Sequence, residues 1–268
     1  MKKIILFSSI FFAGLVSAQE TTDIKKTIEK ANAGDVNAQL TLGILSFSEN
    51  ISLEESYKKA AYWYNKAAEQ GNPVAQYNIG AFYYKGLGVK QSDSKAFYWW
   101  KKAAEQGNPD AQNNIGLFYN KGIEVKQSDS KAFYWWKKAA EQGNPDAQIS
   151  MGFCYYGGKG IEQSNSKAFY WWKKAAEQGN PDAQVRLGNC YNVGIGVEKS
   201  KSKAFYWYNK AAEQGNSTAQ GLLGVCYSAG IGVEKSKSKA IYWLRKACEN
   251  FNDEACEFLN KISKNENY

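Results

Sequence analysis

The chain of 268 residues contains no histidine and only four prolines. Histidine is the commonest general base and metal ligand in proteins, and the usual activator of a nucleophilic serine or cysteine. We therefore expect no catalytic residue, no metal site, no cofactor and no small-molecule substrate. Beyond the N-terminal segment, no run of about 18 apolar residues occurs. The sequence therefore predicts no transmembrane helix.

The four prolines all occupy one position of a repeat of about 36 residues. They stand in Gly71-Asn72-Pro73, Gly107-Asn108-Pro109, Gly143-Asn144-Pro145 and Gly179-Asn180-Pro181, and Gly215-Asn216-Ser217 continues the series without proline. Glycine is typical just after a helix, asparagine caps the next helix, and proline suits its first turn. A period of this length predicts a solenoid, in which each unit buries its apolar face against its neighbours.

Each unit contains two predicted helices joined by a glycine-rich loop. In the unit starting at Asn72, the first helix runs from about 73 to 84 and the second from about 93 to 106. Apolar and small residues at helical spacing predict a buried face on the first helix: Ala75, Ile79, Gly80 and Tyr83. The recurring glycine predicts a neighbouring helix too close for a side chain. Ser92 and its equivalents predict the N-cap of the second helix.

All nine tryptophans lie in two adjacent positions of the second helix. The first position holds Trp63, Trp99, Trp135, Trp171, Trp207 and Trp243, and the second holds Trp100, Trp136 and Trp172. We predict that the first set forms the core of the stack, since aromatic residues at helical spacing are usually buried. Tyr64, Tyr208 and Leu244 replace the second set in other units, which leaves open whether one edge of that set is exposed.

The repeat resembles the Sel-one-like repeat (SLR) family, which is related to the tetratricopeptide repeat. The resemblance rests on Ala-x-x-Trp-Tyr-x-Lys-Ala-Ala-Glu-Gln-Gly-Asn at 204–216 and Ala-Gln-x-x-x-Gly-x-x-Tyr-x-x-Gly-x-Gly-Val at 75–89. It implies an all-α, right-handed α/α superhelix that recognises proteins. Bacterial members are often exported and act in host contact, envelope signalling or immunity against secreted toxins.

The first 18 residues are typical of a secretory signal peptide. Lys2 and Lys3 precede the apolar run 4–16, and Val16-Ser17-Ala18 predicts cleavage before Gln19. We therefore expect a soluble protein of the periplasm or the extracellular space. Because Gln19 is not a cysteine, no lipid anchor is indicated. We expect six repeats over 35–251 within the solenoid 19–268, an N-terminal half-unit at 22–34 and a capping helix within 252–268.

The net charge of +8 falls to +6 without the two lysines of the signal peptide. This charge is dispersed along the chain, which suits solubility and leaves an acidic partner as the alternative. Nucleic acid is disfavoured by the predicted export and by the absence of a lysine cluster.

Five cysteines raise the question of which of them can meet. Cys248 ends the last repeat and Cys256 begins the closing helix, so they should face each other across a helix pair. Their Cys-x₇-Cys spacing also resembles the disulfide of cysteine-rich exported SLR proteins, and we predict this bridge. Cys154, Cys190 and Cys226 lie 36 residues apart in a position occupied elsewhere by phenylalanine. We interpret them as buried free thiols, because equivalent atoms of stacked units lie beyond bridging distance.

Comparison of the copies separates a nearly constant second helix from a variable first helix. The string Lys-Ala-Phe-Tyr-Trp-Trp-Lys-Lys-Ala-Ala-Glu-Gln stands unchanged in three copies. We predict that the variable face lines a concave, partner-binding surface, with drift on a solvated surface as the alternative. The candidate residues are Tyr77, Asn78, Asn113, Asn114, Leu117, Ile149, Ser150, Phe153, Val185, Arg186 and Asn189. A second candidate surface is the tyrosine series Tyr62, Tyr98, Tyr134, Tyr170, Tyr206 and Tyr242, which could instead cover neighbouring helices.

These observations favour an exported scaffold that binds a protein partner. Immunity against a secreted toxin is the concrete role that the family resemblance suggests, and the toxin would be the partner. A secreted virulence or host-interaction factor is the alternative. A β-lactamase-like or cell-wall enzyme is the third candidate.

Overall fold

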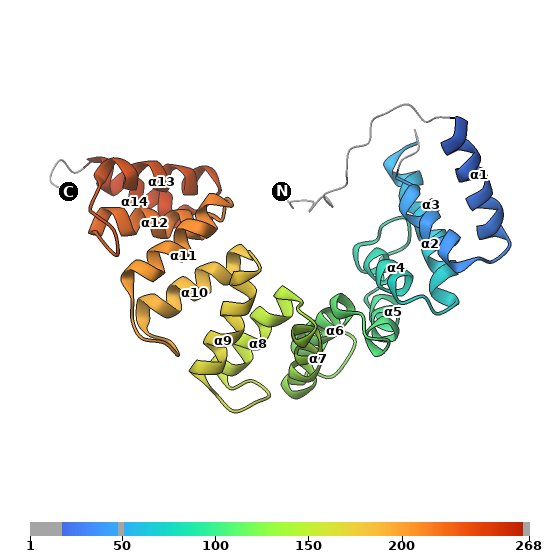
Figure 1. Cartoon of the computed structure of the whole chain (residues 1–268), viewed down its shortest axis with the longest axis horizontal. Helices are drawn as coiled ribbons and strands as arrows, with labels where there is room; N and C mark the ends of the chain where they lie inside the picture. Colours follow the sequence, from blue (N-terminus) through green and yellow to red (C-terminus); the bar gives the residue numbers. More distant parts are fainter. Residues whose placement is uncertain (1–17, 48–50, 265–268) are drawn as a thin grey trace. The chain divides into compact units, whose positions relative to one another are not determined.

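The computed structural model describes residues 18–47 and 51–264, and over this part it contains fourteen helices and no strand (Figure 1). The predicted signal peptide lies outside the described residues except for Ala18. The helices are α1 Ala18–Asn32, α2 Val36–Leu45, α3 Leu53–Glu69, α4 Pro73–Lys85, α5 Asp93–Glu105, α6 Pro109–Lys121, α7 Asp129–Glu141, α8 Pro145–Gly157, α9 Asn165–Glu177, α10 Pro181–Val193, α11 Lys201–Glu213, α12 Ser217–Ala229, α13 Lys237–Glu249 and α14 Asp253–Lys264. None of them is both long and apolar enough to cross a bilayer.

The helices divide into two compact units, with the boundary along the chain between Ala96 and Phe97, within α5. In the first unit α2 packs on α1 and α3, and α3 packs on α4. In the second unit each helix from α6 to α14 packs against the next along the chain. This sequential packing of helix pairs is that of an all-α solenoid, as predicted. We call the first helix of each repeat (α2, α4, α6, α8, α10, α12) helix A, and the second (α3, α5, α7, α9, α11, α13) helix B.

Local capping fixes the ends of the helices, as the sequence indicates. Asn72, Asn108, Asn144, Asn180 and Asn216 each accept a hydrogen bond from the backbone N–H three residues later, at the start of helix A. Ser128, Ser164, Ser200 and Ser236 do the same at the start of helix B. The glycines that precede the asparagines have φ between 86° and 96°. Such caps satisfy backbone groups that a helix end leaves without partners.

A buried glutamine in helix A connects consecutive repeats. Gln148 Nε2 donates to the carbonyl oxygen of Ala140 in the preceding repeat over 3.2 Å, and Gln148 Oε1 accepts from Gln178 Nε2, at the end of helix B in its own repeat, over 2.8 Å. The same pair of bonds occurs at Gln112 and Gln184. Each amide is therefore satisfied inside the stack, as a buried polar group requires. The sequence repeats this glutamine in the string Ala-Gln, but its role becomes visible only in the structure.

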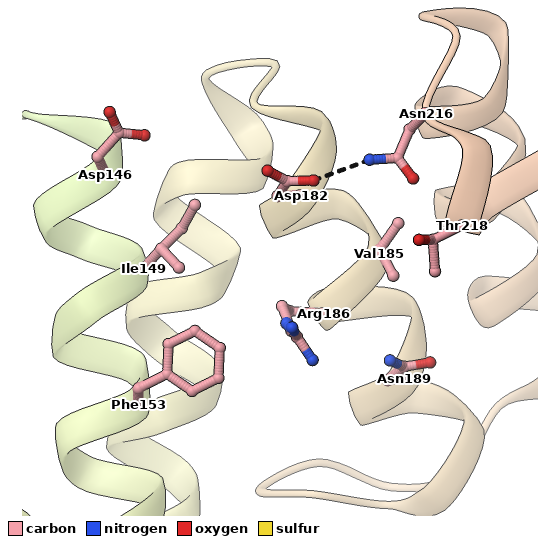
Figure 2. A pocket seen from close by; sticks show the side chains of 9 residues that line it. All are labelled: Asp146, Ile149, Phe153, Asp182, Val185, Arg186, Asn189, Asn216 and Thr218. Atoms are coloured by element: carbon pink, nitrogen blue, oxygen red, sulfur yellow. Dashed lines mark hydrogen bonds between the residues drawn. The ribbon is translucent and has the colours of Figure 1, made fainter. Parts of the chain in front are cut away.

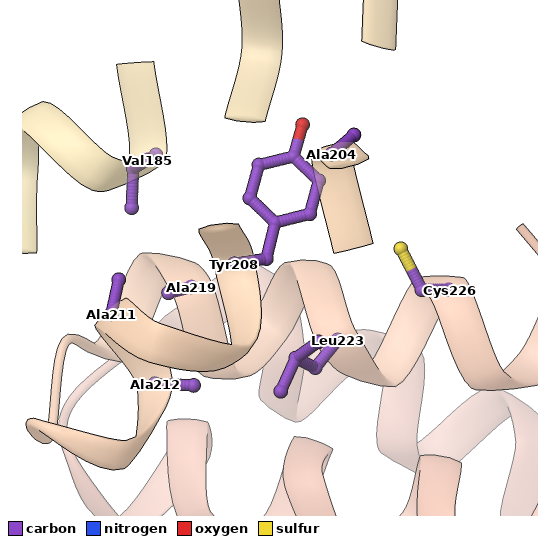
Figure 3. Packing of buried hydrophobic residues seen from close by; sticks show 8 residues of the cluster. All are labelled: Val185, Ala204, Tyr208, Ala211, Ala212, Ala219, Leu223 and Cys226. Atoms are coloured by element: carbon purple, nitrogen blue, oxygen red, sulfur yellow. The ribbon is translucent and has the colours of Figure 1, made fainter. Parts of the chain in front are cut away.

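The core contradicts the predicted ranking of the two tryptophan positions. The second tryptophan position is buried in every repeat, where it is occupied by Tyr64, Trp100, Trp136, Trp172, Tyr208 and Leu244. Of the first set only Trp99 is buried, and the others are half-buried. Tyr208 is 2 % exposed and stands within a cluster that includes Ala204, Leu223 and Cys226 (Figure 3). The spine of the solenoid is therefore the second position.

The recurring glycine of helix A makes room for this spine. A Cβ atom at Gly116 or Gly152 would overlap the indole ring of Trp136 or Trp172, respectively, and one at Gly224 would overlap the side chain of Leu244. The predicted close approach is thus made by a helix B side chain rather than by a helix backbone. Each indole also donates a hydrogen bond, from Trp172 Nε1 to the Ile149 carbonyl oxygen over 3.2 Å, for example.

The C-terminal helix α14 closes the second unit. It packs on α13 and contacts α12, and its Ala255 and Ile262 are buried with Leu244. Cys248 and Cys256 are joined by a disulfide with a Cα–Cα distance of 4.9 Å. Cys154, Cys190 and Cys226 are free and buried. Burial raises the pKa of the Cys190 thiol to about 12 and those of the Cys154 and Cys226 thiols to about 11.

Candidate functional site: a groove along the helix A face

A hollow of about 460 Å³ lies between the helix A segments α8, α10 and the start of α12 (Figure 2). Residues one turn apart along each helix point into it, because side chains at spacings of three and four share a helix face. Its lining consists of Asp146, Ile149 and Phe153 from α8, Asp182, Val185, Arg186 and Asn189 from α10, and Asn216 and Thr218 from the last repeat. Carboxylates therefore border one end, apolar side chains line the middle, and an arginine lies towards the other end.

The carboxylates at one end come from the second position of successive helix A segments. Asp182 Oδ1 accepts a hydrogen bond from Asn216 Nδ2 over 2.8 Å, and Asp146 Oδ1 accepts one from Asn180 over 3.4 Å. Partial desolvation raises the pKa of Asp146, which keeps an exposed edge, and the negative charges of Asp110 and Asp182 raise it further, while the hydrogen bond from Asn180 opposes them. This end of the hollow is consequently a site where a positive charge is favourable.

Phe153 and Arg186 lie against each other, away from the carboxylate end of the hollow. The Phe153 ring packs edge to face on Trp172, with ring centroids 5.5 Å apart, and the Arg186 guanidinium lies 4.9 Å from the Phe153 ring centroid. Phe153 is nevertheless 42 % exposed. An exposed aromatic ring that is held by a buried indole and by a guanidinium is a rigid apolar surface, which is the property of binding hot spots.

A second hollow of about 430 Å³ shares Phe153 with the first. It lies between α6 and α8 and is lined by Leu117, Asn120, Asp129, Trp136, Ser150, Phe153, Cys154, Tyr156, Gly157 and Lys159. Phe153 thus belongs to both hollows. We call the residues of the two hollows the helix A groove.

The structure brings together most, though not all, of the predicted binding residues. Seven of the eleven line the groove, from α6, α8 and α10 of the second unit: Leu117, Ile149, Ser150, Phe153, Val185, Arg186 and Asn189. Asn113 and Asn114 are half-buried on α6 outside the lining, and the Asn113 carbonyl oxygen accepts from Trp136 Nε1. Tyr77 and Asn78 are half-buried on α4 in the first unit.

Val185 corrects one part of the prediction. It was expected on a face that the internal stripe does not need, but it is 6 % exposed and packs in the cluster around Tyr208. Asn189 is also engaged from within, since its Oδ1 accepts a hydrogen bond from the Tyr208 hydroxyl over 2.6 Å. These two residues therefore shape the floor of the groove and support its exposed members.

Sequence reasoning missed the polar residues at the carboxylate end: Asp146, Asp182, Asn216 and Thr218. Of these four, only Asn216 was recognised, as a helix cap. The available signal was the recurrence of aspartate at 110, 146 and 182, two residues after the capping asparagine. Across residues 18–47 and 51–264, no group of three cysteine, aspartate or glutamate side chains is arranged to hold a metal ion.

The tyrosine series on helix B is exposed and internally partnered. Each member is about half exposed, and each ring packs edge to face on the tryptophan that follows it. A lysine four residues later covers both rings: Lys138 Nζ lies 4.8 Å from the Tyr134 ring centroid and 5.4 Å from that of Trp135. The tyrosines thus pack on the tryptophans of their own helix.

Sequential helix pairs, a constant helix B core and a groove on the variable helix A define a helical-repeat scaffold suited to protein binding. A family model for the Sel1 repeat matches residues 37–72, 73–108, 109–144, 145–180, 181–216 and 217–250. The chain belongs to the Sel1 repeat family.

Two solved structures and one curated protein illustrate the likeness. A protective antigen with an SLR fold from uropathogenic Escherichia coli is 36 % identical, with a TM-score of 0.81 over 89 % of this chain and 51 % of that one. A Sel1 repeat protein from Oxalobacter formigenes is 30 % identical, with a TM-score of 0.73 over 87 % and 97 %. A Sel1-like repeat-containing protein of Acanthamoeba polyphaga mimivirus is 41 % identical over 56 residues, which are 21 % of this chain and 10 % of that protein. The chain thus spans about half of the antigen and a tenth of the viral protein.

Proposed function

We propose that the protein is a scaffold that binds a protein partner through the helix A groove. The observation that carries this proposal is Phe153, an exposed aromatic side chain shared by two adjacent hollows and held between Trp172 and Arg186. The groove also carries the positions that differ most between copies, while helix B is nearly constant. Constant positions build a stack and variable ones give it a target, which supports recognition rather than drift.

The groove suits a peptide segment or helix with mixed side chains. Ile149 and Phe153 offer apolar contacts, Asp146 and Asp182 favour a basic group, and Arg186 favours a carboxylate or a carbonyl. A protein surface presents such groups together. The expected acidic character of the partner is therefore restricted to the part that faces Arg186.

The test is affinity capture from an envelope extract of the producing cells, with substitutions in the groove. Phe153→Ala and Arg186→Glu should each abolish capture of the partner, because they remove the apolar anchor and reverse the charge beside it. Lys102→Glu, on an exposed part of helix B, makes the same change of charge as Arg186→Glu. It should leave capture intact. If Lys102→Glu abolishes capture and the groove variants do not, the binding surface lies on helix B.

We further propose that the protein is exported, with residues 1–18 removed as a signal peptide. The Escherichia coli relative described as a protective antigen supports an export-linked role for the repeat scaffold. N-terminal sequencing of protein recovered from the periplasm or medium should begin at Gln19, and an N-terminus at Met1 would contradict export by this signal.

Two biological roles fit an exported scaffold. Immunity requires a toxin as partner and retention in the periplasm, whereas a host-interaction role requires release from the cell. The relative described as a protective antigen favours the host-interaction role over immunity. Cell fractionation separates them: protein confined to the periplasm supports immunity, and protein in the medium supports host interaction.

A further inference from the structure

The turn between α13 and α14 breaks the pattern of the earlier inter-repeat turns. In those turns the residue with positive φ is glycine: Gly71, Gly107, Gly143, Gly179 and Gly215. Thirty-six residues after Gly215 stands Phe251, with φ of 61°. Left-handed backbone is unfavourable for a residue with a Cβ atom, and phenylalanine has none of the local hydrogen-bonding capacity that lets asparagine tolerate it. Backbone preference therefore does not account for Phe251.

Core packing does not account for it either. Phe251 is 86 % exposed, the largest exposed fraction among the described large apolar side chains. Folding thus places an aromatic ring in water and its backbone in an unfavourable region at the same residue. A residue that opposes the fold in both respects is a candidate for function.

The turn holds Phe251 in a fixed frame. The disulfide between Cys248 and Cys256 encloses it, and its own N–H donates to the Cys248 carbonyl oxygen over 3.0 Å. On its two sides, Asn250 Nδ2 donates to Gln220 Oε1 over 2.9 Å, and Asn252 Nδ2 donates to the Ser217 carbonyl oxygen over 3.1 Å. These bonds tie the turn to α12. The side chain is therefore displayed on a rigid support, which lowers the entropy lost on binding.

The surroundings of Phe251 are acidic. Exposed Glu249, Asp253 and Glu254 flank it, and between Lys246 and Lys261 the sequence contains no lysine or arginine. The whole chain, in contrast, carries a net charge of +8. The turn consequently combines a single apolar protrusion with a local negative charge, which is complementary to an apolar pocket bordered by cations.

We propose that Phe251 anchors a second binding surface, which docks into an apolar pocket bordered by lysine or arginine on a protein partner. The surface comprises Phe251 and the flanking acids Glu249, Asp253 and Glu254. It is separate from the helix A groove, so its test is independent of the proposed function.

The test places the photo-cross-linking residue p-benzoylphenylalanine at position 251 and irradiates the protein with an envelope extract of the producing cells. The expected result is one cross-linked protein, joined at residues that line an apolar pocket flanked by lysine or arginine. The substitutions are compared by affinity capture of the same protein without cross-linking. Its yield should fall at least tenfold with Phe251→Gly, persist with Phe251→Tyr, and weaken with added salt. Arg186→Glu, a substitution in the helix A groove, is measured in parallel because the two surfaces are separate.

Phe251→Gly also separates binding from folding. Glycine suits the left-handed backbone, so this variant should keep or raise the melting temperature while it loses the partner. The proposal is overturned if Phe251→Gly captures the partner as well as the unsubstituted protein does. Cross-links only to a second copy of the chain, or to a protein without such a pocket, would overturn it as well.

Discussion

Trp171 and Trp172 are neighbours in sequence but have different surroundings. Trp172 is 3 % exposed, packs over Gly152 and donates its indole N–H to the Ile149 carbonyl oxygen, whereas Trp171 is half-buried. We predict that Trp172→Ala lowers the free energy of unfolding by about 3–5 kcal/mol, the range for loss of a buried aromatic side chain. Trp171→Ala serves as the matched control and should cost distinctly less. Urea unfolding followed by circular dichroism measures both, and equal losses would contradict the assignment of the spine.

The pKa of Asp146 predicts a pH dependence. Partial desolvation and the neighbouring carboxylates raise the pKa of Asp146 in the folded state, so the folded protein binds this proton more tightly than the unfolded chain does. The ionised carboxylate therefore disfavours folding at pH 7, and that effect disappears as the pH falls below the pKa of the unfolded state. Asp146→Asn should raise the melting temperature at pH 7 and lose this advantage near pH 3.

The control for that measurement is Glu177→Gln, which removes one negative charge from an exposed position of helix B. Its melting temperature should show no comparable gain at pH 7. A gain for Glu177→Gln equal to that of Asp146→Asn would assign the effect to net charge rather than to the groove.

At the scale of elements, the sequence predicts the helices closely because their ends are set locally. Asn72 and Ser128 cap the helices that follow them directly in sequence, and α4 ends at Lys85 against a predicted end at about 84. The choice between Trp171 and Trp172 could not be made in the same way. Adjacent residues of a helix are separated by about 100°, and both lie on the apolar stripe. The contact with Gly152, which involves another helix, decides it.

The groove was predictable in outline for a related reason. The variable face of helix A follows from comparison of the copies, and it includes Ile149, Phe153 and Arg186. The proximity of Asp146 to Asp182 depends on the stacking of one helix A on the next, which no local pattern encodes. Val185 turned inward for the same reason.

The disulfide between α13 and α14 predicts how many cysteines react with an alkylating reagent. With thiols as the readout, alkylation of the denatured, unreduced protein should modify three cysteines, and prior reduction should raise the number to five. The native protein should resist modification at pH 8, because burial raises the pKa of each free thiol to about 11 or 12. Five reactive thiols without reductant would show that Cys248 and Cys256 are not bridged.

At the scale of the molecule, the solenoid joins two kinds of surface in one chain. The helix A groove extends along the second unit and uses side chains that vary from copy to copy, while the acidic turn at Phe251 occurs once, at the terminal repeat. Stability in such a stack is the sum of the units and of the contacts between neighbours. Substitutions in the groove and in the turn are therefore expected to act on binding independently.

The buried glutamines have a consequence for how this protein can change in length. Gln148 bonds to its own repeat junction and to Gln178, and the same pattern recurs at Gln112 and Gln184. Removal or duplication of one or more whole repeats of 36 residues would leave each glutamine with equivalent hydrogen-bond partners. A change that is not a multiple of 36 would leave a buried glutamine without its partner. The number of repeats can thus change in steps of one without leaving a buried glutamine unpaired. Evolution could adjust the reach of the groove without redesigning its interior.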